Sequence, residues 1–181
     1  WDGIDTRLID IDRSRSLRVT YPAFWRQARR LAQETAADVY HAHDLDALWP
    51  AARAARRHDA ALVYDSHELF CEQSSLVDRP AIAFVWRQLE RRLIGQAAAV
   101  ITVGDAIAQR LQSAYELPTT PTVLRNVPLY RTPVASRYVR DELRLPAHEP
   151  VALYQGGFLT DNGLAEQIEA MGNVDVGHLV L

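Results

Sequence analysis

The chain has 181 residues, a formal net charge of −3 at pH 7 and a hydrophobic content of 48%. This composition is typical of an ordinary folded core with room for one domain, or for one domain and part of another. The mildly acidic balance and the dispersed charges argue against nucleic acid as the main partner. All 20 basic residues are arginines, which excludes lysine nucleophiles and P-loop lysines.

The sequence pattern also bears on location. No apolar run approaches the roughly 20 residues that a membrane span needs, and the first residues lack the order of a signal peptide. The single cysteine, Cys71, cannot form an intramolecular disulfide. A reducing, cytoplasmic setting is therefore expected.

Short apolar runs alternate with amphipathic segments along most of the chain. Predicted strands cover residues 38–43, 61–64, 98–103, 122–124, 151–154 and 177–181, and an alternating pattern at 6–11 predicts a strand near a sheet edge. Predicted helices cover residues 22–36, 47–57, 81–96, 106–115, 137–143 and 164–171, with Asp46 as the cap of the second and a loop at 69–80. This order predicts an α/β fold with a parallel sheet, and the uninterrupted apolar strands predict that both of its faces are covered.

The composition of the sequence changes after residue 128, where prolines flank a short predicted helix. The predicted division is a Rossmann-like N-terminal domain at 1–130 that lacks its first strand, a linker at 131–149, and the start of a second domain at 150–181. Because the last residues read as an unfinished apolar strand, we expect the chain to be a fragment of a longer protein.

Polar residues gather where three of the predicted strands end. The groups are His41, His43 and Asp44, then the stretch 65–68 (Asp-Ser-His-Glu), then Gly104 and Asp105. All carboxyl ends of a parallel sheet lie on one edge, so these groups are expected to converge on one crevice. A plainer interpretation is that Asp65 and Ser66 cap a helix and that His67 is incidental.

Two catalytic alternatives follow from these residue types. Zinc binds the side-chain types of His41, His43, His67 and Glu68, and His41 and His43 lie on the same face of a strand. However, no further ligand has a confirming spacing, so no metal is expected and a metallohydrolase stays an alternative. A Ser66–His67 nucleophile pair lacks the Gly-x-Ser-x-Gly elbow, and nothing supports a dyad of Cys71 with His67.

A glycine pair offers a third possibility for chemistry. Gly156 and Gly157 follow a predicted strand, and a helix starts near Gly163. Backbone N–H groups at such a turn and at a helix N-terminus can hold a phosphate. A plain strand-to-helix turn explains the same residues equally well.

Several segments together resemble family 4 glycosyltransferases of the GT-B fold, in the family's order and at about its spacing. They are D-V-Y-H-A-H-D-L-D-A-L at 38–48, Y-D-S-H-E-L-F at 64–70, A-V-I-T-V-G-D-A-I-A-Q-R-L at 99–111, V-L-R-N-V-P at 123–128 and L-Y-Q-G-G at 153–157 with G-L at 163–164. The resemblance implies two Rossmann-like domains across a cleft and sugar transfer with retention, without a cofactor. The donor would be a nucleotide-diphosphate sugar held mainly by the C-terminal domain. The acceptor, a small molecule, a glycan or a lipid-linked sugar, would lie on the N-terminal domain.

The resemblance also assigns roles to particular residues. His67 stands where the family places a histidine against the donor sugar and its phosphate, and is the expected catalytic contact. Asn126 matches an asparagine near the cleft, and Gly156 and Gly157 match the turn that faces the diphosphate. The other expected substrate-binding residues are neighbours of these positions: His43, Asp44, Glu68, Asp105 and Asn162.

Two departures from the family pattern bear on activity. The family commonly has a basic residue where this chain has Asn162, and often an arginine near Gly157. Its glycine-rich loop would precede Trp1, and its two glutamates separated by seven residues would follow Leu181. The 181-residue chain alone is therefore expected to have no transferase activity.

Other interpretations remain open at this point. A non-catalytic sugar-nucleotide-binding or scaffold protein of the same fold would explain the missing basic residues. A nucleotide-sugar 2-epimerase would need carboxylates and histidines in the second domain that this chain does not show. The helix at 22–36, with its arginines and tryptophan, leaves peripheral contact with a membrane as an alternative to simple packing.

Overall fold

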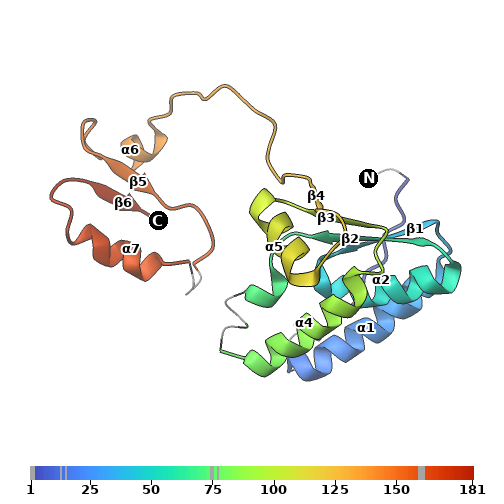
Figure 1. Cartoon of the computed structure of the whole chain (residues 1–181). Helices are drawn as coiled ribbons and strands as arrows, with labels where there is room; N and C mark the ends of the chain where they lie inside the picture. Colours follow the sequence, from blue (N-terminus) through green and yellow to red (C-terminus); the bar gives the residue numbers. More distant parts are fainter. Residues whose placement is uncertain (1–2, 13, 15, 74–75, 77, 159–161) are drawn as a thin grey trace. The chain divides into compact units, whose positions relative to one another are not determined.

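A computed structural model describes residues 3–12, 14, 16–73, 76, 78–158 and 162–181 (Figure 1). The chain divides into two compact units, residues 1–127 and 128–181.

The first unit is built on a parallel sheet. Its strands are β1 (Val39–His43), β2 (Ala61–Ser66), β3 (Ala99–Thr102) and β4 (Thr122–Val123), and they lie side by side in chain order. The connecting helices are α2 (Asp44–His58), α4 (Pro80–Ile94) and α5 (Asp105–Tyr115). The predicted parallel α/β class is confirmed.

The helices α1 (Leu17–Glu34), α2 and α4 lie on the same side of this sheet (Figure 1). Strand burial alternates accordingly: Tyr40, Ala42, Leu62 and Tyr64 are buried, whereas Val39 is exposed. The prediction that both faces are covered is wrong for the described residues. Sequential parallel strands joined by right-handed crossovers place all their helices on one face.

An aromatic cluster fills the space between the helices and the sheet. Trp86 of α4 contacts Tyr21 and Trp25 of α1 edge to face, and Phe70 packs on the same indole. Trp25 also donates its indole N–H to the backbone carbonyl of Asp46, at 2.8 Å. The tryptophan of the first helix is therefore packed between α1 and α2 rather than presented to a membrane.

A buried carboxylate joins three elements beneath the sheet. Glu90 of α4, only 2% exposed, accepts hydrogen bonds from the hydroxyls of Tyr64 (2.8 Å) and Tyr115 (2.5 Å) and from the Cys71 thiol (3.3 Å). Burial and the nearby carboxylate raise the pKa of both tyrosines. This network fixes α4 against β2 and α5.

The second unit is smaller and has little buried surface. Strands β5 (Val151–Leu153) and β6 (His178–Val180) pair in parallel, with α7 (Leu164–Met171) between them in sequence. A five-residue helix, α6 (Tyr138–Glu142), precedes them. None of its described helices contains a buried residue.

Several predicted boundaries need correction. Residues 6–11 form no strand. The first helix begins at Leu17 rather than at residue 22, because the Ser16 side chain accepts from the backbone N–H of Arg18 and caps it. The second helix begins at Asp44, directly after β1, so Asp46 lies within its first turn and is not its cap. The predicted loop at 69–80 contains a 3₁₀ turn, η1 (Phe70–Glu72), and its residues 74, 75 and 77 lie outside the described part.

Replacing Glu90 by Leu is expected to lower the free energy of unfolding by about 2–5 kcal/mol, because the buried Tyr64 hydroxyl, the partly buried Tyr115 hydroxyl and the Cys71 thiol lose their acceptor. Urea denaturation followed by circular dichroism measures this change. The matched control is Glu34→Leu, which removes an exposed carboxylate paired with Arg30 and should cost no more than about 0.5 kcal/mol. Equal losses in the two variants would contradict a structural role for Glu90.

The reactivity of the Cys71 thiol provides an independent test of the hydrogen-bond network around Glu90. Burial, followed by the charge and hydrogen bond of Glu90, raises the pKa of its thiol to about 12. The thiolate is the reactive form, and its fraction at pH 8 is about a thousandfold lower at a pKa of about 12 than at the ordinary value. Labelling with a disulfide reagent at pH 8 should therefore be at least about a hundredfold slower in the native chain than in 8 M urea. The chain has one cysteine, so the signal is unambiguous. Similar rates in both states would show that the thiol is not held in this network.

Candidate functional site

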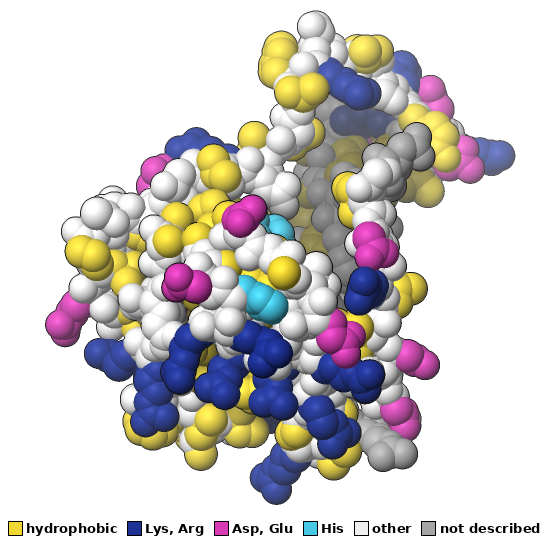
Figure 2. Space-filling model, turned by 90° about the vertical axis from the view of Figure 1, so that its right-hand side faces the viewer, with side chains coloured by type: hydrophobic (Ala, Val, Ile, Leu, Met, Phe, Trp, Pro, Cys, Tyr) yellow, Lys and Arg dark blue, Asp and Glu magenta, His cyan; other side chains and the backbone are white. Residues whose placement is uncertain are grey.

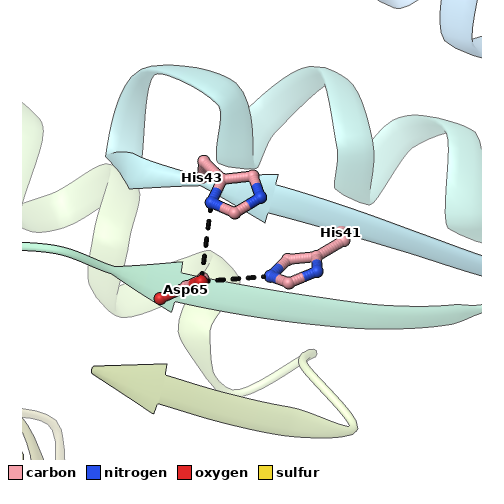
Figure 3. A group of neighbouring side chains, drawn as sticks. All are labelled: His41, His43 and Asp65. Atoms are coloured by element: carbon pink, nitrogen blue, oxygen red, sulfur yellow. Dashed lines mark ion pairs between the residues drawn. The ribbon is translucent and has the colours of Figure 1, made fainter. Parts of the chain in front are cut away.

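The pairing of β1 with β2 assembles the candidate site. His43 lies opposite Asp65 in the parallel register, and His41 lies opposite Val63. Because side chains alternate along a strand, His41, His43 and Asp65 project from the face that the described helices leave open. Figure 3 shows the two imidazoles directed at the Asp65 carboxylate.

One carboxylate oxygen is shared by three histidines. Oδ2 of Asp65 lies 3.4 Å from Nε2 of His41, 3.5 Å from Nδ1 of His43 and 3.6 Å from Nε2 of His67. Nδ1 of His43 and Nε2 of His67 are 3.1 Å apart. The imidazoles of His41 and His43 also stack, with ring centroids 4.4 Å apart. These four side chains, His41, His43, Asp65 and His67, are called the histidine cluster below.

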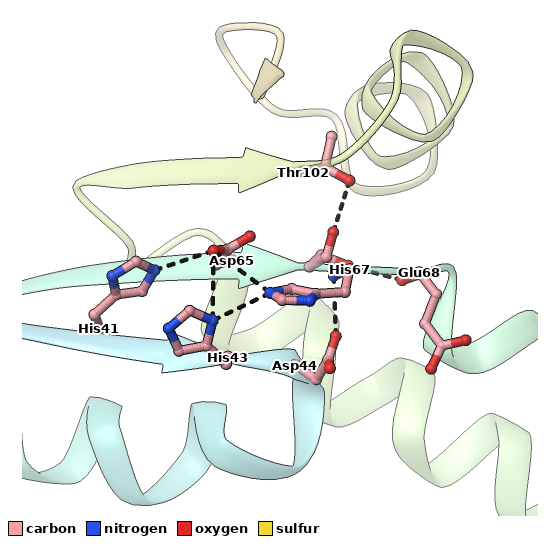
Figure 4. A network of polar contacts seen from close by, with 8 residues as sticks. His41, His43, Asp44, Asp65, His67, Glu68 and Thr102 are labelled. Carbon is pink, nitrogen blue, oxygen red and sulfur yellow. Dashed lines mark hydrogen bonds and ion pairs between the residues drawn. The ribbon is translucent and has the colours of Figure 1, made fainter. Parts of the chain in front are cut away.

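The backbone that carries His67 is held at two points (Figure 4). The N–H of His67 donates to Oδ1 of Asp44 at 3.0 Å, and the carbonyl of Ser66 accepts from the buried Thr102 hydroxyl at 2.7 Å. The Ser66 hydroxyl in turn donates to the carbonyl of Glu68. Contacts from β3 and from the start of α2 therefore fix the end of β2.

The predicted site residues outside this cluster behave differently. Glu68 points away from the histidines in Figure 4, and its carboxylate accepts from Gln73 at 2.6 Å. Asp105 forms an exposed ion pair with Arg125, at 2.6 Å. Asn126 is exposed on the segment after β4. The structure thus joins His67 with the side chains of His43 and Asp44 into one network, and the side chains of Glu68 and Asp105 lie outside it.

The predicted residues of the second unit form a local network of their own. The hydroxyl of Tyr154 donates to the carbonyl of Gly157 at 2.7 Å, and the Asn162 amide donates to the same carbonyl at 3.0 Å. A Cβ on Gly156 would lie 3.3 Å from the Tyr154 hydroxyl, so the turn is closely approached there. Gly163, at φ +64°, precedes α7. Residues 159–161 lie outside the described part.

Asp65 is the central residue that sequence reasoning left out of the predicted site. In the sequence it is one residue of the polar stretch 65–68, but its side chain is only 14% exposed and contacts all three histidines. Alternate side chains of a strand point to opposite faces, and this pattern could have placed Asp65. Asp65 lies on the same face of β2 as Val63, whereas Tyr64 and Ser66 are buried on the other face. The register with His43 could not be read from the sequence.

Comparison with known proteins now defines the class. The model of glycosyltransferase family 4 matches residues 6–127, which is more than half of the chain. No curated protein matches the chain. The site therefore lies in a Rossmann-like glycosyltransferase domain, and the chain belongs to glycosyltransferase family 4. The family expected from the sequence motifs is confirmed.

A solved structure supports the same fold. Sucrose-phosphate synthase from Thermosynechococcus elongatus matches with a TM-score of 0.66 at 21% sequence identity. The match covers 94% of this chain and 43% of that enzyme, so the chain spans less than half of its length. In the part of the chain that the structure describes, no helix is both long and apolar enough to cross a membrane.

Asp44 offers a test of how the site is held. Its backbone adopts φ 61°, and its carboxylate accepts from the N–H of His67. Asp44→Ala is expected to lower the free energy of unfolding by about 1–3 kcal/mol, because it removes the acceptor and places alanine in a left-handed conformation. Asp44→Asn keeps an acceptor and tolerates that conformation, so its loss should be smaller. Urea denaturation compares the two, and equal losses would contradict this account.

Proposed function

We propose that this chain is part of a retaining glycosyltransferase that uses a nucleotide-diphosphate sugar. The match to family 4 over residues 6–127 carries the proposal. The proposal includes transfer with retention and a nucleotide-sugar donor. It also includes the division of the chain into an acceptor-side domain at 1–130, a linker at 131–149 and the start of a donor-binding domain at 150–181. The placement of His67 at a braced strand end supports the proposal, because transfer needs a rigidly positioned polar group.

His67 is the proposed catalytic contact. As the bond from the sugar to the diphosphate breaks, negative charge grows on the leaving phosphate oxygens. A fixed hydrogen-bond donor lowers the energy of that state without reorganising. The shared carboxylate of Asp65 and the neighbouring His43 orient the His67 ring for this role. The proposed substrate-binding residues are His43, Asp44, Glu68, Asp105, Asn126, Gly156, Gly157 and Asn162.

His67→Ala is expected to lower kcat by about a hundredfold to a thousandfold, the usual cost of losing one such donor. The measurement is sugar transfer by the full-length glycosyltransferase of which this chain is proposed to be part, with a panel of nucleotide sugars and detection by mass spectrometry. His148→Ala is the matched control, because His148 is an exposed histidine of the other unit. Unchanged kcat in the His67 variant would remove His67 from the reaction.

A non-catalytic sugar-nucleotide-binding protein is the second candidate. It is favoured by Asn162, whose uncharged amide is already bonded to the Gly157 carbonyl and the Tyr154 hydroxyl. None of these three residues would place a positive charge beside a bound diphosphate. Under this alternative, nucleotide sugars of the same panel would bind to the full-length protein in calorimetry but give no transfer product.

The acceptor side offers a positively charged surface. Arg26, Arg29 and Arg30 of α1 and Arg57 of α2 line one surface hollow together with Gln27, Gln33 and Glu34. Figure 2 shows arginine side chains gathered on one face of the molecule. Such a surface attracts anionic groups, which supports a phosphate-bearing acceptor or contact with an anionic membrane surface. A small molecule, a glycan and a lipid-linked sugar all remain within the proposal.

A further inference from the structure

A cavity of about 280 Å³ lies between α4, α5 and the 3₁₀ turn η1. Glu90, Cys71 and Tyr115 line it, and Glu90 is bonded to Tyr64 on the helix-covered face of β2. The histidine cluster lies on the other face of that strand, with Asp65. None of the described residues that line the cavity belongs to the predicted site, so the cavity is separate from it.

The walls of this cavity are linked to one another by hydrogen bonds. The Arg91 guanidinium of α4 donates to the carbonyl of Ala114 of α5 at 3.0 Å and lies 5.8 Å from the centre of the Tyr115 ring. The Arg110 guanidinium of α5 donates twice to Oε1 of Glu72 in η1, at 2.9 and 2.7 Å. Because the side chains of the walls are already fixed in this way, a ligand that enters loses little free energy by ordering them.

Arg87 is the cation of the cavity that has no such partner. It lies one turn before Arg91 on α4, and it is exposed to solvent. Among the residues that the structure describes, no hydrogen bond or ion pair involves its guanidinium. Three arginines and two glutamates line the cavity, so the formal charge of the lining is one positive. A ligand with one anionic group would therefore balance it.

A carboxylate suits this lining better than a cationic group does. Burial and the charge of Glu90 raise the pKa of the Cys71 thiol, and the charge of Arg87 acts against them, so the guanidinium lies near the buried end of the cavity. A guanidinium binds a planar carboxylate through two parallel hydrogen bonds. An incoming cation would meet three arginines, and the buried Glu90 carboxylate already accepts three hydrogen bonds.

The rest of the lining favours an apolar body for the ligand. Leu111, only 2% exposed, and Ala114 lie along the α5 wall, and Leu69 adds to the apolar surface. An apolar group that packs against these side chains leaves water, which favours binding. The volume of about 280 Å³ is just below the usual range of small-molecule sites, roughly 300–1,000 Å³, so the ligand must be small.

We infer that the cavity between α4, α5 and η1 binds a small organic acid. The carboxylate of the acid pairs with Arg87, and its apolar body packs against Leu111 and Ala114. The ligand also contacts the network that anchors β2, because Glu90 is bonded to Tyr64. The inference does not depend on the proposed transfer reaction, since binding is measured directly.

The test is a calorimetric titration of the full-length protein with benzoate, benzamide and benzylamine, which have similar shapes but are anionic, neutral and cationic at neutral pH. Benzoate should bind with one-to-one stoichiometry and at least about tenfold more tightly than the other two compounds. Arg87→Gln should weaken benzoate binding at least about tenfold. The matched control is Arg92→Gln, which removes an exposed arginine of α4 that does not line the cavity and should bind benzoate as the wild type does. Absence of saturable benzoate binding, equal affinity for the three compounds, or equal affinity in the Arg87 variant and the wild type would overturn the inference.

A second measurement needs no variant and therefore does not depend on whether a variant folds. A crystal structure of the full-length wild type with benzoate should show the carboxylate on the Arg87 guanidinium and the ring against Leu111 and Ala114. Benzoate bound elsewhere, with none in the cavity between α4 and α5, would overturn the assignment.

Discussion

The parallel pairing of β1 with β2 is the constraint on which the candidate site depends. Its register sets His43 opposite Asp65 and leaves both side chains on the same face as His41. A shift of one residue would turn the β2 side chains over, burying Asp65 and exposing Tyr64. The apolar residues on the helix-covered face, Leu62 and Tyr64, oppose that shift. The hydrophobic core therefore fixes the position of the polar cluster on the opposite face.

One face of the sheet packs against the core, and the other face presents the polar side chains of the candidate site. Beneath the sheet, Tyr64 donates to the buried Glu90, which also binds Tyr115 and Cys71. Above it, the next residue, Asp65, contacts three histidines that solvent can reach. One stretch of β2 thus anchors the strand on one side and presents a shared carboxylate on the other. This rigidity suits the proposed sugar-phosphate contact.

Much of the architecture was predictable because it depends on local pattern. The apolar runs around Tyr40, Leu62 and Ile101 predicted parallel strands, and the match over residues 6–127 confirms the expected family. Boundaries were less accurate: residues 6–11 form no strand, and the capping role expected of Asp46 is wrong because α2 begins at Asp44. A strand that turns directly into a helix through a left-handed aspartate leaves no loop signal in the sequence.

The sequence by itself determined which chemical groups end the strands, since the periodicity and the motifs place His43, Asp44 and His67 there. Only the tertiary structure decided which of them meet. Strand register and the turn at Asp44 bring three histidines to one oxygen of Asp65, while Glu68 bonds to Gln73 and Asp105 to Arg125. The reason is physical: residues more than 20 positions apart become neighbours only through long-range backbone pairing, which local sequence does not encode.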